Sequence, residues 1–487
     1  MKLRIAFCVS LGACVALAQL AAEFHPCRVT GKTMPGAWVV ANSGEIAQAD
    51  EKGHYEIVFP VQGVYCLKAM KDGYGEAVRP WLVVPARAPV DLPLWALPDP
   101  KRRVVHGNLG HPAQLTITDS GQPVRGFDFA GTPVGGYPAP KGVWHHRNRH
   151  FWTAGEYAFT ATGEVKIVES LDFPELRKRG WYKGDFHAHI VHGENFYRAN
   201  LQQMNFICRA ERYDWIWLSQ AHANDEYPLD NGRLCEYLSD GRLFLRINNE
   251  LMLWLLCRPD MVPVVDFFYF PEDRAEKFWY RLLNKGYTLA CSGTSDAAFD
   301  VGRTPGDSHA TYAKLDKVDG DSIVRAFREG RTMVSYFGAG VIIEIDGKTS
   351  GDKLPPGPQA RTLVVDAYAD PGKDFTLRVI RNGEVFEERN FTAPADGHFS
   401  FTRTLVEKEN AWYVAMLKNA GSKAPRAAAS PIYFRGPDFR PPEVVPFPRP
   451  LPQNIKDRIH FLTPQEVDTD AWYEELKRLL KEANATR

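Results

Sequence analysis

Residues 184–189 read Gly-Asp-Phe-His-Ala-His, and this stretch carries the strongest sign of both fold and chemistry in the chain. It is interpreted as a β-strand, in which side chains two positions apart point to the same face. His187 and His189 are therefore expected to face the same way. Two neutral imidazoles at this spacing can bind one metal ion such as Zn²⁺.

Three other expected strands are each followed by a side chain that can bind a metal ion. His222 follows the segment 214–218, Glu250 follows 242–247, and Asp296 follows 287–291. Because α/β barrels assemble their sites at the C-terminal ends of the strands, these side chains are expected to converge. Taken singly, His222 could instead be a loop histidine, Glu250 a solvated carboxylate and Asp296 a helix cap. The predicted metal ligands are His187, His189, His222, Glu250 and Asp296.

Helix-like and strand-like segments alternate over residues 179–337. Such alternation is typical of βα units around a mostly parallel sheet. Helices are expected at 272–285 and 321–328, and strands at 287–291 and 332–336. This part of the chain is therefore predicted to be an α/β domain that carries the metal site at one end.

Regions with strand-like, period-two patterns flank this domain at residues 24–98 and 338–435. Turn residues separate short apolar runs in both regions, so each is predicted to be a β-sandwich. Residues 99–178 are expected to form a β-rich connecting region, and residues 436–487 a Pro-rich arm and a terminal helix. The expected strands of the two sandwiches include 37–41, 54–58, 64–69, 341–345, 362–366, 376–380 and 412–416.

Acidic and basic residues balance, with 59 Lys plus Arg and 59 Asp plus Glu. Nucleic-acid binders usually carry a basic excess, so nucleic acid is not expected as a partner. The chain has eight Cys and no CxxC pair, so a zinc site made of thiolates is not expected. Cys27 and Cys66 fall in one small β-rich region of an exported protein, where a disulfide between them could persist.

Residues 1–22 have the pattern of a bacterial secretory signal peptide. Two basic residues open the segment, and no further charge follows until Glu23. Small residues near Ala18 and Ala22 offer cleavage sites, so the mature protein is expected in the periplasm or outside the cell. A retained anchor and a lipoprotein modified at Cys14 are the less favoured alternatives. No later stretch is long and apolar enough to cross a bilayer.

Residues 24–98 also resemble the transthyretin-like domains related to carboxypeptidase regulatory modules. The stretches PGAWVV, ADEKGHYEI and YCLKAMKDGY match the usual order of strand, turn and strand in those domains. The resemblance implies a β-sandwich fold and says nothing about catalysis or ligand binding.

Four stretches resemble the PHP-domain (polymerase and histidinol phosphatase) metallohydrolases, and among these the CehA/McbA-like group. They are GWYKGDFHAH, LLNKGYTLACSGTSDAAF, DSIVRAFREGRTMVSYFGAGVIIEIDGKTSGD and AAASPIYF, which occur in this order between residues 175 and 435. The resemblance implies a distorted (β/α)₇ barrel that binds divalent ions at its C-terminal face. The fold class expected for the chain is therefore multidomain α/β plus β, with this barrel between two β-sandwiches.

The resemblance also bears on individual residues. His187, His189, Glu250 and Asp296 fall on metal-ligand positions of the group, and His222 lies near its TDH motif, where this chain reads SQAH. Three features of the group are missing from this chain. No GH follows Glu250, no HP segment occurs, and Ala298 stands where the group often has a histidine, two positions after Asp296. The resemblance therefore implies fewer metals than a full trinuclear site, and it leaves a degenerate barrel open.

His192 and His309 are candidate catalytic residues. His192 follows His189 by three positions, and His309 occurs in PGDSHATYAK, where the resembling group commonly carries an arginine. Either could be a substitute ligand, a substrate contact or the general acid that protonates a leaving group. An exposed loop histidine is the alternative for each.

Together these features predict an exported hydrolase that depends on a divalent metal, with zinc expected first and manganese or iron as alternatives. One or two ions would lower the pKa of bound water and supply hydroxide near neutral pH. The expected substrate is a small molecule with an ester, carbamate, amide or phosphoester bond. The alternative is a non-catalytic cell-surface or carbohydrate-binding scaffold with a degenerate PHP barrel. A metal-independent esterase is disfavoured because the chain has no GxSxG motif.

Overall fold

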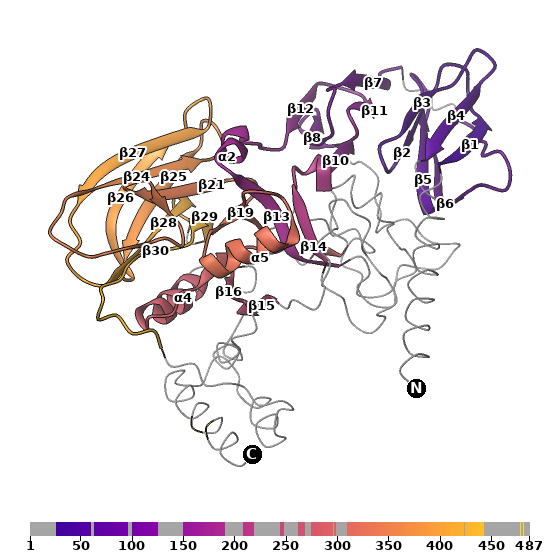
Figure 1. The fold of residues 1–487 in the computed structure, drawn as a ribbon. Helices are drawn as coiled ribbons and strands as arrows, with labels where there is room; N and C mark the ends of the chain where they lie inside the picture. The colour runs from indigo at the N-terminus through magenta and orange to yellow at the C-terminus, as the bar shows by residue number, and fades with distance from the viewer. Residues whose placement is uncertain are drawn as a thin grey trace, which may run out of the picture. The chain divides into compact units, whose positions relative to one another are not determined.

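The computed structural model describes residues 26–59, 63–95, 100–124, 150–189, 208–218, 244–247, 262–267, 274–295, 297–298, 309–422 and 424–442, with residues 478 and 481. Figure 1 shows the elements. The chain divides into two compact units, which are described separately. Unit 1 comprises Met1–Ser170, His187–Leu238 and Ala297–Pro305, and unit 2 comprises Leu171–Phe186, Ser239–Asp296 and Gly306–Arg487. The predicted signal peptide lies outside the described residues.

The N-terminal part of unit 1 contains two antiparallel sheets. One pairs β1 (Cys27–Lys32) with β4 (His54–Phe59), and the other has the order β3 (Ile46–Gln48), β2 (Trp38–Ala41), β5 (Gly63–Met70) and β6 (Ala77–Val84). Buried and exposed residues alternate along β1 and β4, as expected when one face of a sheet is buried. The inward side chains of both sheets form one apolar core, and the strands predicted in this region are confirmed.

The connecting region of unit 1 is also built from strands. β7 (Arg103–Asn108) pairs with β11 (Glu156–Ala161), and β8 (Ala113–Asp119) lies between β10 (His150–Thr153) and β12 (Val165–Glu169). The short strand β9 (Gln122–Pro123) also pairs with β8. Unit 1 further contains β14 (Trp215–Leu218) and β18 (Ala297–Ala298).

Unit 2 is dominated by two antiparallel sheets. The larger includes, in order, β13 (Trp181–His189), β19 (His309–Lys314), β20 (Thr332–Tyr336), β29 (Pro425–Ala429), β28 (Ala411–Asn419), β25 (Asp374–Arg381) and β26 (Glu384–Thr392). The second has the order β22 (Lys348–Thr349), β21 (Gly340–Ile345), β24 (Arg361–Tyr368) and β27 (His398–Leu405). The short strands β23 (Lys353–Leu354) and β30 (Ile432–Phe434) pair in parallel. Side chains of both sheets share one core, and the strands predicted in this region are confirmed.

Unit 2 also contains helices α2 (Pro174–Lys178), α4 (Arg274–Asn284) and α5 (Gly320–Glu329). The carboxylate of Asp319 caps α5 by accepting from the backbone N–H of Ser322 at 2.8 Å, and Gly330 ends it with a left-handed φ of 74°. These are the residue types that favour helix ends, because a short acceptor satisfies a free N–H and glycine tolerates positive φ. The helices expected near α4 and α5 are confirmed.

The expectation of a distorted (β/α)₇ barrel over residues 179–337 is wrong. Among the described residues, 49% are in strands and 10% in helices, and no barrel is evident. A barrel needs parallel neighbours joined by helices, whereas β19 is antiparallel to both β13 and β20. The parallel set β15 (Phe244–Ile247), β16 (Val262–Asp266) and β17 (Ala290–Ser292) has too few strands to close. Because α5 joins two antiparallel strands, the alternation of helix and strand in the sequence did not imply a parallel sheet.

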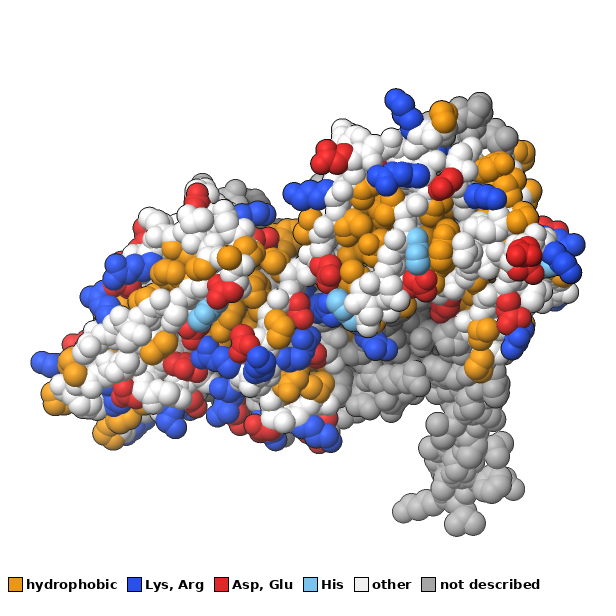
Figure 2. Space-filling view, turned by 90° about the horizontal axis from the view of Figure 1, so that it is seen from above, with side chains coloured by type: hydrophobic (Ala, Val, Ile, Leu, Met, Phe, Trp, Pro, Cys, Tyr) orange, Lys and Arg blue, Asp and Glu red, His pale blue; other side chains and the backbone are white. Residues whose placement is uncertain are grey.

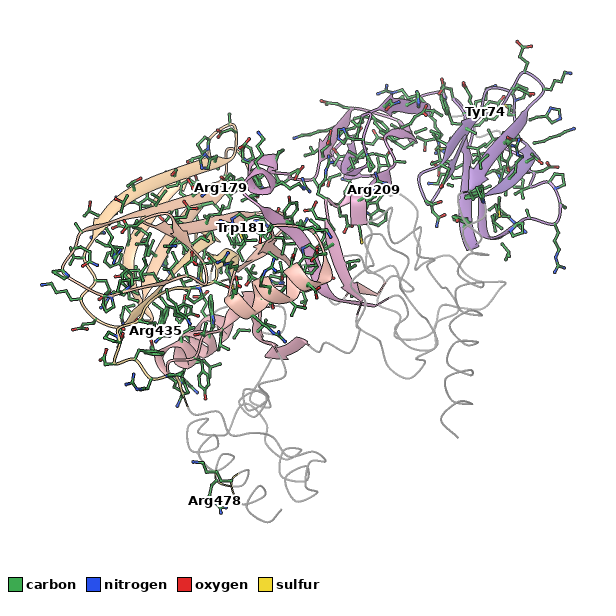
Figure 3. The ribbon with its side chains drawn as sticks, in the orientation of Figure 1. Tyr74, Arg179, Trp181, Arg209, Arg435 and Arg478 are labelled. Atoms are coloured by element: carbon green, nitrogen blue, oxygen red, sulfur yellow. The ribbon has the colours of Figure 1, made fainter. Side chains whose placement is uncertain are left out.

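The start of β13 is anchored on the sandwich of unit 2 (Figure 3). The guanidinium of Arg179 donates to Asp366 in β24 at 2.6 Å and lies 2.9 Å from Glu344 in β21. Trp181 is buried in an apolar cluster with Tyr312 and Met333. The ion pairs of Arg179 and the buried side chain of Trp181 therefore fix the start of the strand that contains the Gly-Asp-Phe-His-Ala-His stretch.

Cys27 and Cys66 are both free thiols, so the disulfide considered between them is not formed. Burial raises the pKa of the Cys66 thiol to about 12, which keeps it protonated and unreactive near neutral pH.

Charged side chains of both signs are interspersed on the face of the molecule that Figure 2 shows. This distribution agrees with the balanced composition of the chain. In the part of the chain that the structure describes, no helix has the length and apolar character needed to span a membrane.

We expect the buried carboxylate of Glu407 to be essential for the stability of unit 2. It is 3% exposed and accepts from Arg381 Nε at 2.6 Å, Arg381 Nη2 at 2.9 Å and the Tyr413 hydroxyl at 2.8 Å. Glu407→Ala removes the acceptor of these donors, so it should lower the free energy of unfolding by about 2–4 kcal/mol. The control Glu388→Ala breaks an exposed pair with Arg378 and should cost less than about 1 kcal/mol. Urea unfolding measures both, and equal losses would contradict the expectation.

Glu45 should make the N-terminal sandwich less stable at alkaline pH. Burial raises the pKa of its carboxyl to about 7 from an ordinary value of 4.5, although the Ser43 hydroxyl donates to it. Because the folded pKa lies above the unfolded one, the contribution to stability is full below pH 4.5 and is lost as the pH rises through 7.

Glu45→Gln should remove this dependence between pH 4.5 and 7. The gain at pH 8 should be about 1–2 kcal/mol, less than the full shift implies, because the carboxyl keeps some contact with water. Thermal unfolding of the wild type and the variant across this range measures the effect. Asp50→Asn is the control: backbone amides lower the pKa of Asp50, so it titrates below the window and the slope should not change. A slope that persists in Glu45→Gln would refute the assignment.

Candidate functional site

The strand that carries the predicted histidine pair is confirmed. β13 extends from Trp181 to His189, and the strands expected before His222, Glu250 and Asp296 correspond to β14, β15 and β17. The structure describes the backbone of His187 and His189 but not their side chains. His309 is the predicted site residue whose side chain is described. The other predicted site residues lie outside the described residues: His192, His222, Glu250 and Asp296.

Asp185, two positions before His187, is a fully buried carboxylate in β13. Its Oδ2 accepts from the backbone N–H of Ser295 at 3.1 Å and also from the Ser295 hydroxyl. A carboxylate can remain in such a site only when hydrogen-bond donors replace the water that it loses. This interaction attaches the segment before Asp296 to β13. Asp185 and Ser295 were not predicted as site residues.

Thr311 of β19 binds the same segment. Its hydroxyl accepts from the backbone N–H of Gly293 at 3.0 Å and donates to the backbone carbonyl of Gly293 at 2.8 Å. Ser292, Thr294, Ser295 and Thr311 are all buried. A buried segment that hydrogen bonds attach to two strands has little freedom, so residues 293–295 form a rigid support within unit 2.

Gly293 is required by the close approach of two backbones. A Cβ at this position would lie 2.7 Å from the carbonyl oxygen of Ala310 and 2.7 Å from the Cβ of His309. Only a residue without a side chain allows this contact with β19. The glycine therefore brings the 293–295 segment directly against His309.

His309 begins β19 and pairs with Tyr336 of β20. The two rings are stacked, with centroids 4.6 Å apart and an interplanar angle of 27°. Nδ1 of His309 is buried and has no hydrogen-bond partner within the described part of the chain. Burial lowers the pKa of His309 to about 4, so the imidazole is neutral at pH 7. A neutral imidazole can accept a proton or bind a metal, whereas a general acid near neutral pH needs a higher pKa.

Cys291 immediately precedes this segment and is not a suitable nucleophile. Its thiol is fully buried, lies 3.2 Å from the Ser430 hydroxyl and donates to the carbonyl of Ala428 at 3.4 Å. Burial raises the pKa of the thiol to about 12. Because the thiolate is the reactive form, this cysteine serves packing rather than chemistry.

No three His, Cys, Asp or Glu side chains among those described come together in a way that could hold a metal ion. The predicted ligand side chains are not among the described ones, so this finding concerns the rest of the molecule. The chemistry of the predicted set fits a divalent ion, because imidazoles and carboxylates are the usual ligands of catalytic zinc.

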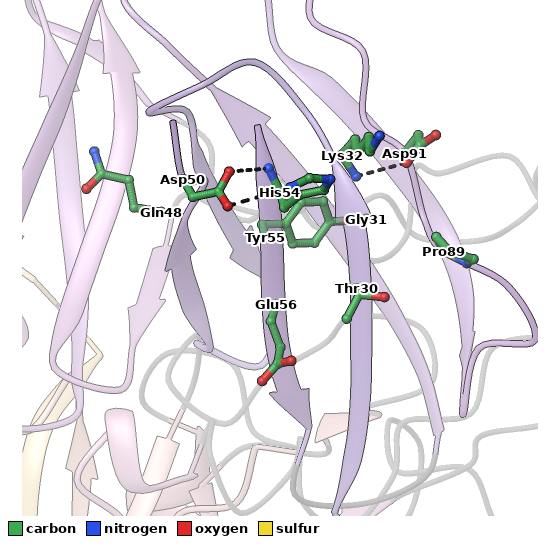
Figure 4. Close-up of a pocket in the computed structure, with 10 residues that line it drawn as sticks. All are labelled: Thr30, Gly31, Lys32, Gln48, Asp50, His54, Tyr55, Glu56, Pro89 and Asp91. Atoms are coloured by element: carbon green, nitrogen blue, oxygen red, sulfur yellow. Dashed lines mark hydrogen bonds and ion pairs between the residues drawn. The ribbon is translucent and has the colours of Figure 1, made fainter. Parts of the chain in front are cut away.

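A polar hollow of about 750 Å³ lies on the N-terminal sandwich, far in sequence from β13 (Figure 4). Asp50 and Asp91 line it together with Lys32 and His54. Asp50 accepts from the backbone N–H of His54 at 2.8 Å, and Asp91 accepts from the backbone N–H of Lys32 at 2.8 Å. Because these carboxylates bind backbone amides, their first role is to hold the turn after β3 and the edge of β1.

The Thr311 hydroxyl should be essential for the support of residues 293–295. Thr311→Val keeps the shape but leaves the buried N–H and C=O of Gly293 without partners, so it should lower the free energy of unfolding by about 2–4 kcal/mol. Thr311→Ser keeps the hydroxyl and loses one methyl group, so it should cost only about 1 kcal/mol. Urea unfolding of the two variants measures the difference. If serine proves as damaging as valine, the methyl group and not the hydrogen bonds stabilises this segment.

None of the models of known protein families matches the chain. None of the curated proteins matches it either.

Proposed function

We propose that this chain is an exported hydrolase that depends on a divalent metal and acts on an ester, carbamate, amide or phosphoester bond of a small molecule. One observation supports this most: both chain neighbours of Asp296 lie beside β13. Ser295 is bound to Asp185, and Ala297 of β18 pairs in parallel with Ala188. β13 is the strand that carries His187 and His189. An aspartate and two histidines from neighbouring segments are a suitable set of ligands for zinc.

In this proposal, His187, His189, Glu250 and Asp296 bind the metal, with His222 as a further ligand. Zinc, or manganese or iron in its place, would supply an activated water near neutral pH when one or two ions are bound. His192 and His309 are the candidates for handling the proton of the leaving group. Because burial keeps the imidazole of His309 neutral, the role of a metal ligand suits it better than that of a general acid. The resemblance of the β13 motif to the CehA/McbA-like metallohydrolases supports the same reaction class.

Hydrogen bonds of buried residues support the segment that precedes the proposed ligand Asp296. Asp185 and Thr311 bind the 293–295 segment to β13 and β19. Because metal ligands must be held within a fraction of an ångström of their productive positions, rigid flanking segments favour binding. Residues 1–22 are proposed to direct the protein to the periplasm or the medium and to be removed there.

Replacing both His187 and His189 by alanine should remove the metal and abolish hydrolysis. Two imidazoles are lost from the ligand set, and the remaining carboxylates bind zinc less tightly. The variant should remain folded, because the cores of both units are built from other side chains. Elemental analysis and a panel of ester, carbamate and phosphoester substrates measure metal and activity together.

The control is the double variant His54→Ala, His111→Ala, which removes two partly exposed histidines elsewhere in unit 1. It should retain both metal and activity. A wild-type protein that holds no stoichiometric divalent metal, even after reconstitution, would overturn the proposal. The binding-scaffold alternative would then take its place.

A further inference from the structure

The polar hollow on the N-terminal sandwich has a floor of two paired strands and a wall on each side (Figure 4). The floor is the outer face of β1 and β4, where Lys32 and His54 lie opposite each other. Residues 89–92 form one wall, because the backbone N–H groups of Val90 and Leu92 each donate to a carbonyl of β1 at 2.8 Å. This segment therefore extends the floor as a further edge.

Both walls are fixed by hydrogen bonds. The Tyr55 hydroxyl donates to the carbonyl of Val90 at 2.5 Å. Gly31 allows this close approach, since a Cβ there would lie 1.8 Å from the same carbonyl oxygen. The turn at Asp50 forms the wall on the other side, and its carboxylate accepts from two backbone N–H groups of that turn at 2.8 Å each. A hollow with fixed walls loses little freedom when a ligand binds.

The side chains that line the hollow offer both donors and acceptors. Among the described residues, none forms a hydrogen bond or an ion pair with the ammonium of Lys32 or the hydroxyl of Thr30. Glu56 uses one carboxylate oxygen for Arg28, and Asp91 uses one for the backbone N–H of Lys32. The second oxygen of each carboxylate can accept further hydrogen bonds. A ligand in the hollow can therefore both donate and accept.

The wall made by residues 89–92 continues to an exposed tryptophan. Exposure alternates along residues 89–95, and Asp91, Pro93 and Trp95 are all exposed. This period of two places the Trp95 side chain on the same side as Asp91, about 13 Å further along the extended chain. Trp95 is 68% exposed, the largest fraction among the exposed large hydrophobic side chains described. Its backbone is fixed, because its carbonyl accepts from the N–H of Gly75 at 2.9 Å.

We propose that the hollow and Trp95 together bind a neutral oligosaccharide. Each sugar hydroxyl both donates and accepts, so neighbouring hydroxyls can bond to the Lys32 ammonium and to a carboxylate at the same time. The apolar C–H face of a sugar ring can stack on an exposed indole. An anionic ligand would meet the carboxylates of Asp50, Glu56 and Asp91. An apolar ligand would remove water from these groups without replacing its hydrogen bonds.

This binding activity goes beyond the proposed hydrolysis and does not depend on it. Isothermal titration of the full chain with cellotriose, maltotriose and mannotriose measures it directly. At least one trisaccharide should bind. Triethylene glycol is the control ligand, because it has ether oxygens and hydroxyls but no ring and no neighbouring hydroxyls, and it should not bind. Failure of all three trisaccharides to bind would overturn the proposal.

Two variants locate the bound sugar. Trp95→Ala removes the stacking surface and Lys32→Met removes the charged donor, so each should weaken binding by about tenfold. Trp95→Tyr keeps a ring and should retain most of the affinity. The controls are Val83→Ala, at a side chain 64% exposed on β6, and Lys348→Met, at an exposed lysine of β22. Both controls should bind as the wild type does.

All of these side chains are exposed, so each variant should melt at the wild-type temperature. Weaker binding in Trp95→Ala alone would exclude the hollow, and weaker binding in Lys32→Met alone would exclude the tryptophan. Either result would overturn the proposal as stated.

The double variant His187→Ala, His189→Ala separates this inference from the proposed function. It should bind the trisaccharide with wild-type affinity, because those histidines lie on β13 and not on the N-terminal sandwich. Loss of sugar binding in this variant, with Trp95→Ala unaffected, would assign the sugar to the proposed metal site and overturn the inference. A wild type that binds the sugar through Trp95 and holds no metal would count against the hydrolase alone.

Discussion

The arrangement of unit 2 around β13 depends on one buried carboxylate. Asp185 lies inside a sheet, where a carboxyl group is stable only if hydrogen-bond partners replace the water that it loses. Ser295 supplies two of these partners from a segment 110 residues away in the sequence. These two bonds hold the segment after β17 against β13. Thr311 and Gly293 then complete the attachment to β19.

This constraint explains why a polar stretch can be packed so deeply. Ser292 and Ser295 would each be costly to bury alone, yet the Ser292 hydroxyl donates to the carbonyl of Val265 at 3.5 Å, and Ser295 donates to Asp185 from both its backbone and its hydroxyl. The same attachment brings the segment against His309, whose burial keeps its ring neutral. The proposed metal site therefore depends on these few hydrogen bonds.

Local patterns in the sequence predicted the strands of both sandwiches and the two amphipathic helices, because alternating burial and helix caps are properties of short segments. The direction in which strands pair is not local. β19 and β20 are joined by a helix, as parallel neighbours would be, yet they pair antiparallel, and the barrel expectation failed for this reason. The histidine pair was visible from spacing alone. Asp185, Ser295 and Thr311 could not be found in that way, because their bonds join segments that are far apart in the sequence.

The contact between Gly293 and Thr311 has a consequence for how this chain can vary in evolution. The glycine cannot acquire a side chain because the backbone of β19 occupies that space, and the threonine cannot lose its hydroxyl because the glycine backbone needs both of its bonds. Each position limits the substitutions allowed at the other. The two should therefore behave as an epistatic pair, and related sequences should change them together or not at all.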